Sequence, residues 1–203
     1  MMILRSSPPS PFGRQAKLAA KHLGLIDKVT IELADTTNPE DSLREQNPLG
    51  KIPVLITSDG VAIYDSRVIV EYLDHIAGGG KIVPTGDAKF PAYTLQSLAN
   101  GIADAALIQV YENRFRPEEL RSQDWMDYQA EKVKRGMDAL ESSPPRFADA
   151  DDIHIGHIAL ACALGYLDLR FNGGWRNTHP NLVAWLDSFS ALVPGFEETK
   201  VSA

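Results

Sequence analysis

The sequence predicts an α/β domain followed by an all-α domain. Short runs that alternate apolar and polar residues precede residue 78, and apolar residues recur at helical spacing from about residue 87 onward. Gly78-Gly79-Gly80 and Pro84-Thr85-Gly86 separate the two patterns, and consecutive glycines cannot sustain a helix. The predicted division is a domain of residues 1–78, a linker of residues 79–86 and a domain of residues 87–203.

The first half of the amino-terminal domain is predicted to be strand, helix and strand. Residues 2–4 form a short apolar run, and the prolines after it prevent a helix until Pro11, which suits a first helical position. Ser10 is then the N-cap of a helix that stops at Gly24. Residues 29–33 alternate apolar and polar side chains, which is the period of a strand.

The second half of this domain is predicted to be a hairpin that follows a turn. Asn-Pro-Leu-Gly at 47–50 is a turn, and the apolar, mostly β-branched run 54–56 indicates a strand directly after Pro53. Asp59-Gly60 is a strong signal for a tight hairpin to a second strand at 61–63. Because proline has no N–H to donate, it is confined to the start or edge of a strand.

The helix after this hairpin offers a site for an anion. Asp65 or Ser66 is its natural N-cap, and the free N–H groups of its first turn can bind a carboxylate. Ile52, beside Pro53, has backbone groups that need partners from elsewhere. The whole order, βαβ followed by ββα, fits a thioredoxin-like sheet with helices on its faces.

These residues resemble a known family. Asn-Pro-Leu-Gly-Lys-Ile-Pro-Val-Leu at 47–55, followed by Asp65-Ser66, resembles the glutathione-binding half of the glutathione S-transferase superfamily. The first loop, Ser10-Pro11-Phe12, is similar to that of bacterial members and would make this a serine-type member. The family's all-helical second domain matches the helical pattern of the remaining chain, so the resemblance covers essentially the whole sequence.

The resemblance assigns a role to each residue of the first site. It implies a cis bond before Pro53 and a backbone at Ile52 that pairs, like a strand, with the cysteinyl unit of glutathione. Lys51 would meet the glycyl carboxylate, and Asp65 and Ser66 would hold the γ-glutamyl group. Many relatives carry Glu where this chain has Asp65, which is one methylene shorter.

The catalytic requirement is a thiolate. An ordinary thiol has a pKa near 8.5, and each unit of lowering needs about 1.4 kcal/mol of preferential anion stabilisation. The family places its activating Tyr, Ser or Cys in the first loop; here no Tyr precedes Tyr64, and the lone Cys162 lies in an apolar run typical of a core. Serine remains, with Ser10 ahead of Ser7. Equally, Ser10 is explained as a plain helix cap.

Other candidates carry less signal. Asp104 is expected to face the cleft between domains, since in some relatives an acid from this helix reaches glutathione, sometimes across a dimer. Without the resemblance, Asp104 is only a single exposed aspartate. Tyr111, Phe115 and Trp175 would line the pocket for the electrophile, or simply pack.

The second domain is predicted to hold four helices. The first covers about 87–116, the second begins at Pro117 and ends at Ser143, and the last begins at His179-Pro180. The third covers about 153–171 and is nearly all apolar, so it must be buried at the centre of the domain. Relatives usually start the central helix with Ser, Thr or Asn and an Asp three residues later.

Two histidines stand where that capping pair is expected. By spacing the pair falls on His154 and His157, and the cap is alternatively expected from Asp151 or Asp152. Two histidines three apart also suggest a metal, but no third ligand lies at motif spacing. We therefore predict no metal.

Composition limits the partners. The 203 residues are 44% hydrophobic and carry a net charge of −7, which weighs against nucleic acid while leaving room for a locally basic pocket around Arg14, Lys51 and Arg67. A single cysteine excludes an internal disulfide. No run of about eighteen apolar residues exists to span a bilayer, and we predict a cytoplasmic protein with no membrane partner.

The sequence thus predicts a glutathione transferase that joins reduced glutathione, as co-substrate, to a small hydrophobic electrophile through a thiolate stabilised by Ser10. Family resemblance leads us to expect a homodimer. Two alternatives stay open: a non-catalytic relative that serves as an interaction or regulatory protein, and a glutathione-dependent reductase or peroxidase.

Overall fold

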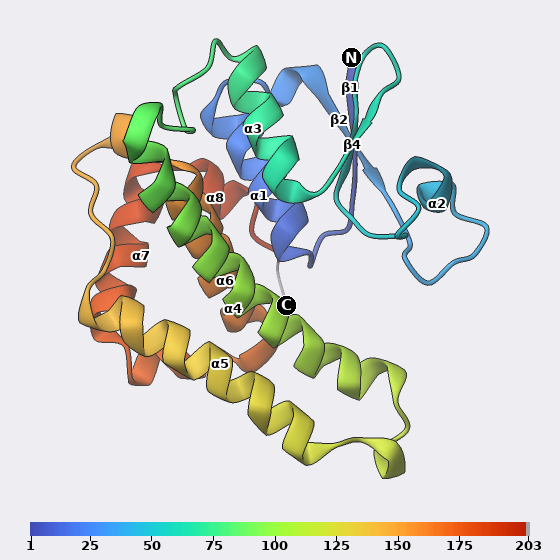
Figure 1. Ribbon diagram of the computed structural model, residues 1–203, viewed down its shortest axis with the longest axis vertical. Helices are drawn as coiled ribbons and strands as arrows, with labels where there is room; N and C mark the ends of the chain where they lie inside the picture. The colour runs from blue at the N-terminus through green and yellow to red at the C-terminus, as the bar shows by residue number, and fades with distance from the viewer. Residues whose placement is uncertain (202–203) are drawn as a thin grey trace.

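The computed structural model describes residues 1–201 and places a small α/β domain against a larger helical domain (Figure 1). Its sheet has the strand order β2-β1-β3-β4. β1 (Met2–Ser6) is parallel to β2 (Val29–Leu33) and antiparallel to β3 (Val54–Ile56), which is antiparallel to β4 (Ala62–Ile63). This mixed sheet is the predicted thioredoxin-like arrangement, which confirms the predicted fold class of the first domain.

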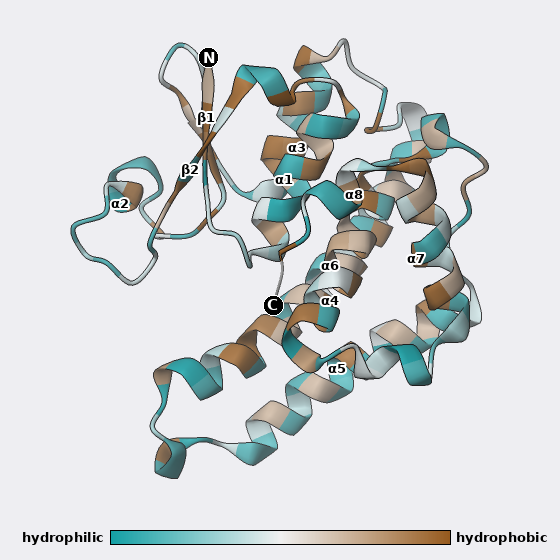
Figure 2. Ribbon diagram, turned by 180° about the vertical axis from the view of Figure 1, so that it is seen from behind, coloured by the Kyte–Doolittle hydropathy of each residue, from teal (hydrophilic) through white to brown (hydrophobic). Residues whose placement is uncertain are grey.

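Helices lie on both faces of the sheet. α1 (Pro11–His22) and α3 (Ser66–Ile76) pack side by side between the sheet and the helical domain (Figure 1). The short α2 (Leu43–Gln46) lies on the other face, where Leu43 is fully buried against a small cluster with Val54. Figure 2 shows the segment around α2 as a mostly hydrophilic loop that stands apart from the helical domain.

The second domain is built around one buried helix. Its helices are α4 (Lys89–Phe115), α5 (Gln123–Ser142), α6 (Ile155–Phe171), α7 (Pro180–Leu192) and α8 (Gly195–Glu198). Every residue from Ile158 to Leu164 on α6 is buried. The helix carries apolar side chains on all of its faces, so it lies in the core. α6 packs on α4 and α1, so it joins the two domains and confirms the predicted buried central helix.

The second predicted helix begins later than expected. Pro117 opens only a single 3₁₀ turn, Glu118–Leu120, and α5 starts at Gln123 with Ser122 as its N-cap. The Ser122 hydroxyl accepts the N–H of Trp125 (3.3 Å), and the Glu112 carboxylate accepts the N–H of Ser122 (3.0 Å). Side-chain acceptors therefore fix this helix start, and Pro117 does not.

The histidine pair itself caps α6. His154 Nδ1 accepts the N–H of Gly156 (3.1 Å), and His157 Nδ1 accepts the N–H of His154 (3.3 Å), which is a reciprocal capping box. The alternative expectation, a cap from Asp151 or Asp152, is wrong. Both belong to the preceding 3₁₀ turn, where the Asp149 carboxylate accepts their N–H groups.

The glycine-rich segment between the domains is held in place. The buried Asp74 carboxylate accepts the N–H groups of Gly80, Lys81 and Ile82 at 2.7–2.9 Å. The Ile82 carbonyl in turn accepts the N–H of Ile155 at the start of α6 (2.9 Å). Our division at residues 78 and 86 stays a prediction, and residues 202 and 203 of the predicted second domain lie outside the described part of the chain.

Candidate functional site

The turn before β3 is fixed by its first side chain. Asn47 is 2% exposed, its Oδ1 accepts the N–H of Leu49 (3.0 Å), and its Nδ2 donates to the carbonyl of Lys51 (2.9 Å). Gly50 has a φ of +60°, a backbone region that glycine adopts readily. These bonds hold the backbone of Lys51 in place and leave its side chain exposed.

The backbone that follows is left without a partner strand. The Ile52–Pro53 bond is cis, as the resemblance implies. The pairing of β3 with β1 begins only at Val54, opposite Arg5. Within residues 1–201 no hydrogen bond uses the N–H or C=O of Ile52. An extended peptide can therefore pair with this residue.

α3 begins beside this edge. Asp65 is the N-cap, and its Oδ1 accepts the N–H of Arg67 (3.0 Å). This bond satisfies only one of the N–H groups that the first turn leaves without an intrahelical acceptor. Ser66 is 2% exposed, and in the described part of the chain its hydroxyl has no hydrogen-bond partner. The helix start thus offers backbone donors and one hydroxyl to a ligand.

Charged groups from three segments influence one another near this place. Burial raises the pKa of Asp104 on α4, while the positive charges of Arg67 and Lys51 act against this rise and the negative charge of Asp65 adds to it. These groups are therefore close enough to act on one another. The charges of Lys51, Asp65 and Arg67 thus act on Asp104, and a role of Asp104 in binding glutathione stays a prediction.

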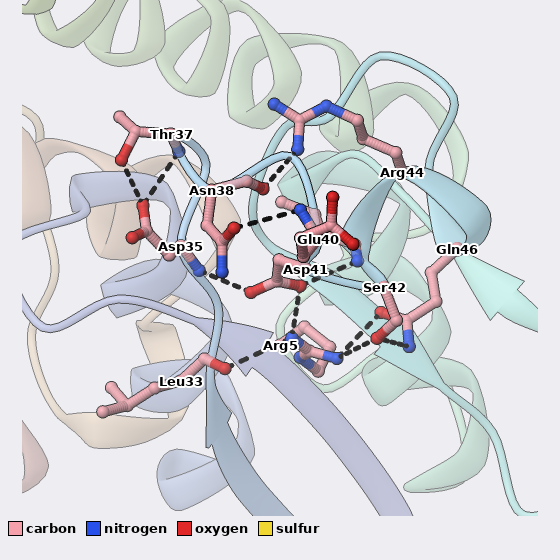
Figure 3. A network of polar contacts seen from close by, with 11 residues as sticks. Arg5, Leu33, Asp35, Thr37, Asn38, Glu40, Asp41, Ser42, Arg44 and Gln46 are labelled. Atoms are coloured by element: carbon pink, nitrogen blue, oxygen red, sulfur yellow. Dashed lines mark hydrogen bonds and ion pairs between the residues drawn. The ribbon is translucent and has the colours of Figure 1, made fainter.

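A buried arginine supports the loop that carries this site (Figure 3). Arg5 on β1 donates to Asp41 Oδ1 (2.7 Å), Ser42 Oγ (3.0 Å) and Gln46 Oε1 (3.3 Å), and so holds the segment that leads into Asn47. Asp41 Oδ2 also accepts the N–H of Asp35 (2.8 Å). Sequence reasoning missed Arg5; the signal was a charged residue inside an otherwise apolar strand.

Ser10 acts as the N-cap of α1, as predicted. Its Oγ accepts the N–H of Gly13 (3.0 Å), which leaves the hydroxyl proton available to donate. A Cβ on Gly13 would lie 2.0 Å from Ser6 Oγ, so any larger residue in this first turn of α1 would displace the Ser6 hydroxyl. Ser7 is half-buried, and its carbonyl accepts the N–H of Ser10 (3.2 Å), which shapes the loop.

Ser10 also lines a pocket of about 420 Å³ between α1, α6, α7 and α8. Pro8, Arg14 and Tyr166 are among its other walls. Arg14 therefore lies in this second pocket, one helical turn from Ser10, and apart from the cluster of Lys51 and Arg67 with which it was grouped.

The aromatic candidates lie outside the residues that line this pocket. Tyr111 is half-exposed on α4 and meets the exposed Phe115 edge to face, with ring centroids 5.1 Å apart. The Trp175 indole donates to Asp168 Oδ1 (2.9 Å) and anchors the turn after α6. A role of these three residues in lining the electrophile pocket stays a prediction.

Comparisons with known proteins agree with this geometry. Residues 9–76 match the profile of the glutathione S-transferase N-terminal domain, and residues 108–188 match that of the C-terminal domain. The chain is 33% identical over 190 residues to the uncharacterized GST-like protein YibF of Escherichia coli, which covers 92% of this chain and 93% of that protein. The chain belongs to the glutathione S-transferase family.

Solved structures resemble this glutathione S-transferase along its whole length. One is a glutathione S-transferase from Methylobacillus flagellatus with glutathione bound, at 33% identity and a TM-score of 0.90. Another is a glutathione transferase family member from Pseudomonas fluorescens Pf-5 with bound S-(propanoic acid)-glutathione, at 33% identity and a TM-score of 0.86. Each alignment covers 100% of both chains.

The described part of this transferase has neither a candidate membrane span nor a candidate metal site. Among residues 1–201, no helix is both long and apolar enough to cross a membrane. The same residues contain no group of three or more His, Cys, Asp and Glu side chains that could hold a metal ion.

Proposed function

We propose that this protein conjugates reduced glutathione to small electrophiles through a thiolate that Ser10 stabilises. The observation that carries the proposal is the unpaired backbone of Ile52, before the cis bond to Pro53 and beside the start of α3. This place combines strand-like backbone partners with N–H donors for a carboxylate, which are the groups that a γ-glutamyl peptide needs.

Each part of glutathione has a partner in this arrangement. The cysteinyl unit pairs with the backbone of Ile52 next to Pro53, and the glycyl carboxylate meets Lys51. Ser66 and the first N–H groups of α3 bind the γ-glutamyl carboxylate, while Asp65 accepts from the γ-glutamyl amine. The bound glutathione in the Methylobacillus flagellatus relative supports this assignment of the ligand.

The chemistry begins at the sulfur. The thiol loses its proton to solvent, and Ser10 donates its hydroxyl proton as a hydrogen bond to the thiolate, near the positive end of α1. The sulfur then uses a lone pair to form a bond to the electrophilic carbon. A leaving group departs with the bonding pair, or the electrons of a double bond take up a proton from water.

Serine is the better candidate on physical grounds. Cys162 is fully buried, and burial raises the pKa of its thiol to about 12, so it is no nucleophile at neutral pH. The bound ligand of the Pseudomonas fluorescens relative, a small acid joined to the sulfur of glutathione, supports conjugation to small electrophiles.

Calorimetry with reduced glutathione tests the binding half of the proposal. We expect saturation at millimolar ligand, and about tenfold weaker binding in Ser66→Ala, because a buried hydroxyl loses its ligand hydrogen bond. Ser58→Ala, an exposed serine in the hairpin, should bind like the wild type. No heat with the wild type would overturn the proposal.

Turnover tests the reaction. We expect the protein to consume an aryl halide, with one halide released for each glutathione. Reduction of an organic peroxide without aryl-halide turnover would instead show a reductase or peroxidase. Binding of glutathione without either reaction would show a non-catalytic protein. We also propose that the protein is cytoplasmic and forms a homodimer. Sedimentation of the purified protein tests the dimer.

A further inference from the structure

Arg14 is a buried cation with no carboxylate partner. Its side chain is 7% exposed, and burial lowers its pKa. Its Nη2 donates to the carbonyl of Phe196 (2.6 Å) and its Nε to Thr199 Oγ1 (3.3 Å). Among residues 1–201, no Asp or Glu oxygen lies within 4.0 Å of its nitrogens. Buried guanidinium groups are normally paired with a carboxylate; here two neutral acceptors and the Phe196 ring, whose centroid lies 4.0 Å from the Arg14 Cζ, stand in that place.

One nitrogen of this guanidinium is left for a ligand. Nη1 has no acceptor in the described part of the chain, and it lies against Gly165 on α6, where a Cβ would come within 2.3 Å of it. Gly165 and Arg14 both line the 420 Å³ pocket. The absent side chain of Gly165 therefore leaves space for Nη1 at the pocket wall.

The other cations of the pocket are already neutralised. Arg176 binds Asp168 through two hydrogen bonds of 2.9 and 2.7 Å, and Lys200 lies 3.4 Å from Glu197. Asp168 and Glu197 act on Arg14 only at longer range. Within the described residues, Arg14 is thus the pocket's cation that lacks an anion in contact.

Ser10 and Arg14 belong to the same stretch of this wall. The N–H of Arg14 donates to the carbonyl of Ser10 (2.9 Å), which places the two residues one turn apart on α1, and both line the pocket. One turn rises about 5.4 Å, which a sulfur–carbon bond, two or three carbon–carbon bonds and the C–O bond of a carboxylate together can span. A sulfur held at Ser10 is therefore within reach of a short acid that binds Arg14.

We propose that Arg14 binds a carboxylate of the second substrate, so that the pocket selects small electrophiles that carry an acid two or three carbons from the reacting carbon. The inference rests on the proposed function and adds a specificity residue to it. Unsaturated short-chain acids fit this description: sulfur bonds to the β-carbon, and the double-bond electrons take a proton from water at the α-carbon.

Two ligands that differ in one group test this assignment. S-(2-carboxyethyl)glutathione and S-propylglutathione have the same chain length, and only the first carries the extra carboxylate. By calorimetry we expect the wild type to prefer the acid by about tenfold or more, as a charge-assisted hydrogen bond allows. Arg14→Gln should abolish the preference and still bind reduced glutathione and S-propylglutathione.

A matched variant separates two roles of Arg14, which are binding the ligand carboxylate and holding the carboxyl-terminal helix through Thr199. Thr199→Val removes the acceptor of Nε and keeps the guanidinium, so its preference should stay that of the wild type. Equal loss of both ligands in Arg14→Gln, or a preference that survives in it, would overturn the proposal. So would the absence of a preference in the wild type.

A second variant covers the case in which Arg14→Gln does not fold. Gly165→Ala places a methyl group against Nη1 and should displace it, so the preference should fall while the charge remains. An unchanged preference in Gly165→Ala would count against the assignment. A wild type that binds neither reduced glutathione nor its S-propyl derivative would instead overturn the proposed function.

Discussion

One oxygen atom, Ser10 Oγ, caps α1 and, in the proposed function, also stabilises the thiolate of glutathione. As an acceptor it caps α1 through the N–H of Gly13, and as a donor it has a free proton for a thiolate. Because the cap fixes the position of the oxygen, its donor direction is set by the same helix that supplies a positive end. A simple helix cap and a thiolate-stabilising group are thus compatible in one side chain.

Ser10→Ala should therefore lose both the cap of α1 and the hydrogen bond to the thiolate. We expect about 1 kcal/mol less free energy of unfolding, as for other caps, and a 10- to 100-fold lower kcat/KM. The ultraviolet absorbance of the bound thiolate reports the second effect directly. If that absorbance and its pH dependence stay unchanged in Ser10→Ala, Ser10 is only a cap.

Another serine provides the control. Ser122 caps α5 by accepting the N–H of Trp125, far along the chain from the glutathione site. Ser122→Ala should reduce the free energy of unfolding by a similar amount and leave kcat/KM at the wild-type value. A parallel loss of activity in both variants would show that Ser10→Ala acts through stability.

Single residues differ in how well the sequence predicts them. The cap at Asp65 and the unpaired backbone at Ile52 could be predicted because cap and strand chemistry is local. The glutathione-binding roles of Lys51 and Ser66 stay predictions. Arg5 was missed because its role depends on a segment more than thirty-five residues away, at Asp41. No local pattern reports such an approach.

The start of α6 is the element whose chemistry depends most on pH. His157 is 1% exposed and neutral, with a pKa lowered to about 4, first by burial and then by the neighbouring His154, whose ring stacks on it at 3.7 Å. Burial also lowers the pKa of His154. Protonation of either ring would remove an acceptor from the capping box.

The protein should consequently lose stability in mild acid. The unfolded histidine takes up a proton near pH 6.5 and the folded one near 4, so the contribution of His157 is complete above pH 6.5 and is lost as the pH falls toward 4. Between pH 7.5 and 5 we expect about 2 kcal/mol lower free energy of unfolding. Urea denaturation at both pH values measures it.

A variant with the usual capping pair is the control for this pH effect. His154→Ser/His157→Asp replaces both rings by acceptors that stay unprotonated down to about pH 4. Its free energy of unfolding should change less between pH 7.5 and 5 than that of the wild type. An equal acid loss in both proteins would assign the effect to other groups.

The segment from Leu33 to Gln46 is a second element with a testable role. Arg5 holds it through Asp41, and it leads directly into the turn that presents Lys51. Asp41→Asn should loosen the segment and raise the KM for glutathione about three- to tenfold, with kcat unchanged, because the chemistry at Ser10 lies elsewhere. Steady-state kinetics with varied glutathione measures this separation.

Asp35→Asn serves as the comparison. Asp35 lies in the same loop, but its carboxylate accepts from the N–H and the hydroxyl of Thr37 and, within residues 1–201, makes no bond to Arg5. Its KM should stay near that of the wild type. A fall of kcat in Asp41→Asn would show that the segment acts on more than glutathione binding.

Element prediction failed where helices are short. α2 and α8 span four residues each, too few for a periodic pattern, and form because tertiary packing buries Leu43 and Phe196. The long helices were found because several turns of apolar spacing leave no other interpretation. The error at Pro117 has the same origin: the Glu112 carboxylate that accepts the N–H of Ser122 belongs to α4.

At the scale of the whole molecule the two domains share one core. A continuous set of buried apolar residues runs from Leu4 and Ile69 in the first domain to Ile158 and Phe189 in the second. The three glycines predicted a linker, and pattern alone gave no sign that Asp74 ties it down. We expect both domains to unfold in one transition.

Asp74→Ala tests this coupling. Three N–H groups of the linker lose a buried acceptor, so the free energy of unfolding should fall by about 2–4 kcal/mol. Asp87→Asn, at an exposed acid just after the predicted linker, should change the free energy of unfolding by less than about 0.5 kcal/mol. Chemical denaturation followed by two probes, one in each domain, would refute a shared core if the wild-type transitions separate.

The burial of Cys162 should protect the protein from alkylation by electrophilic compounds. Its only sulfhydryl is shut inside α6 and stays protonated at neutral pH. Electrophiles that alkylate the sulfur of glutathione therefore meet no accessible sulfhydryl on the folded protein. After hours with excess iodoacetamide, the intact mass should show no adduct at this position unless denaturant is added, and a rapid adduct in the folded protein would contradict that protection.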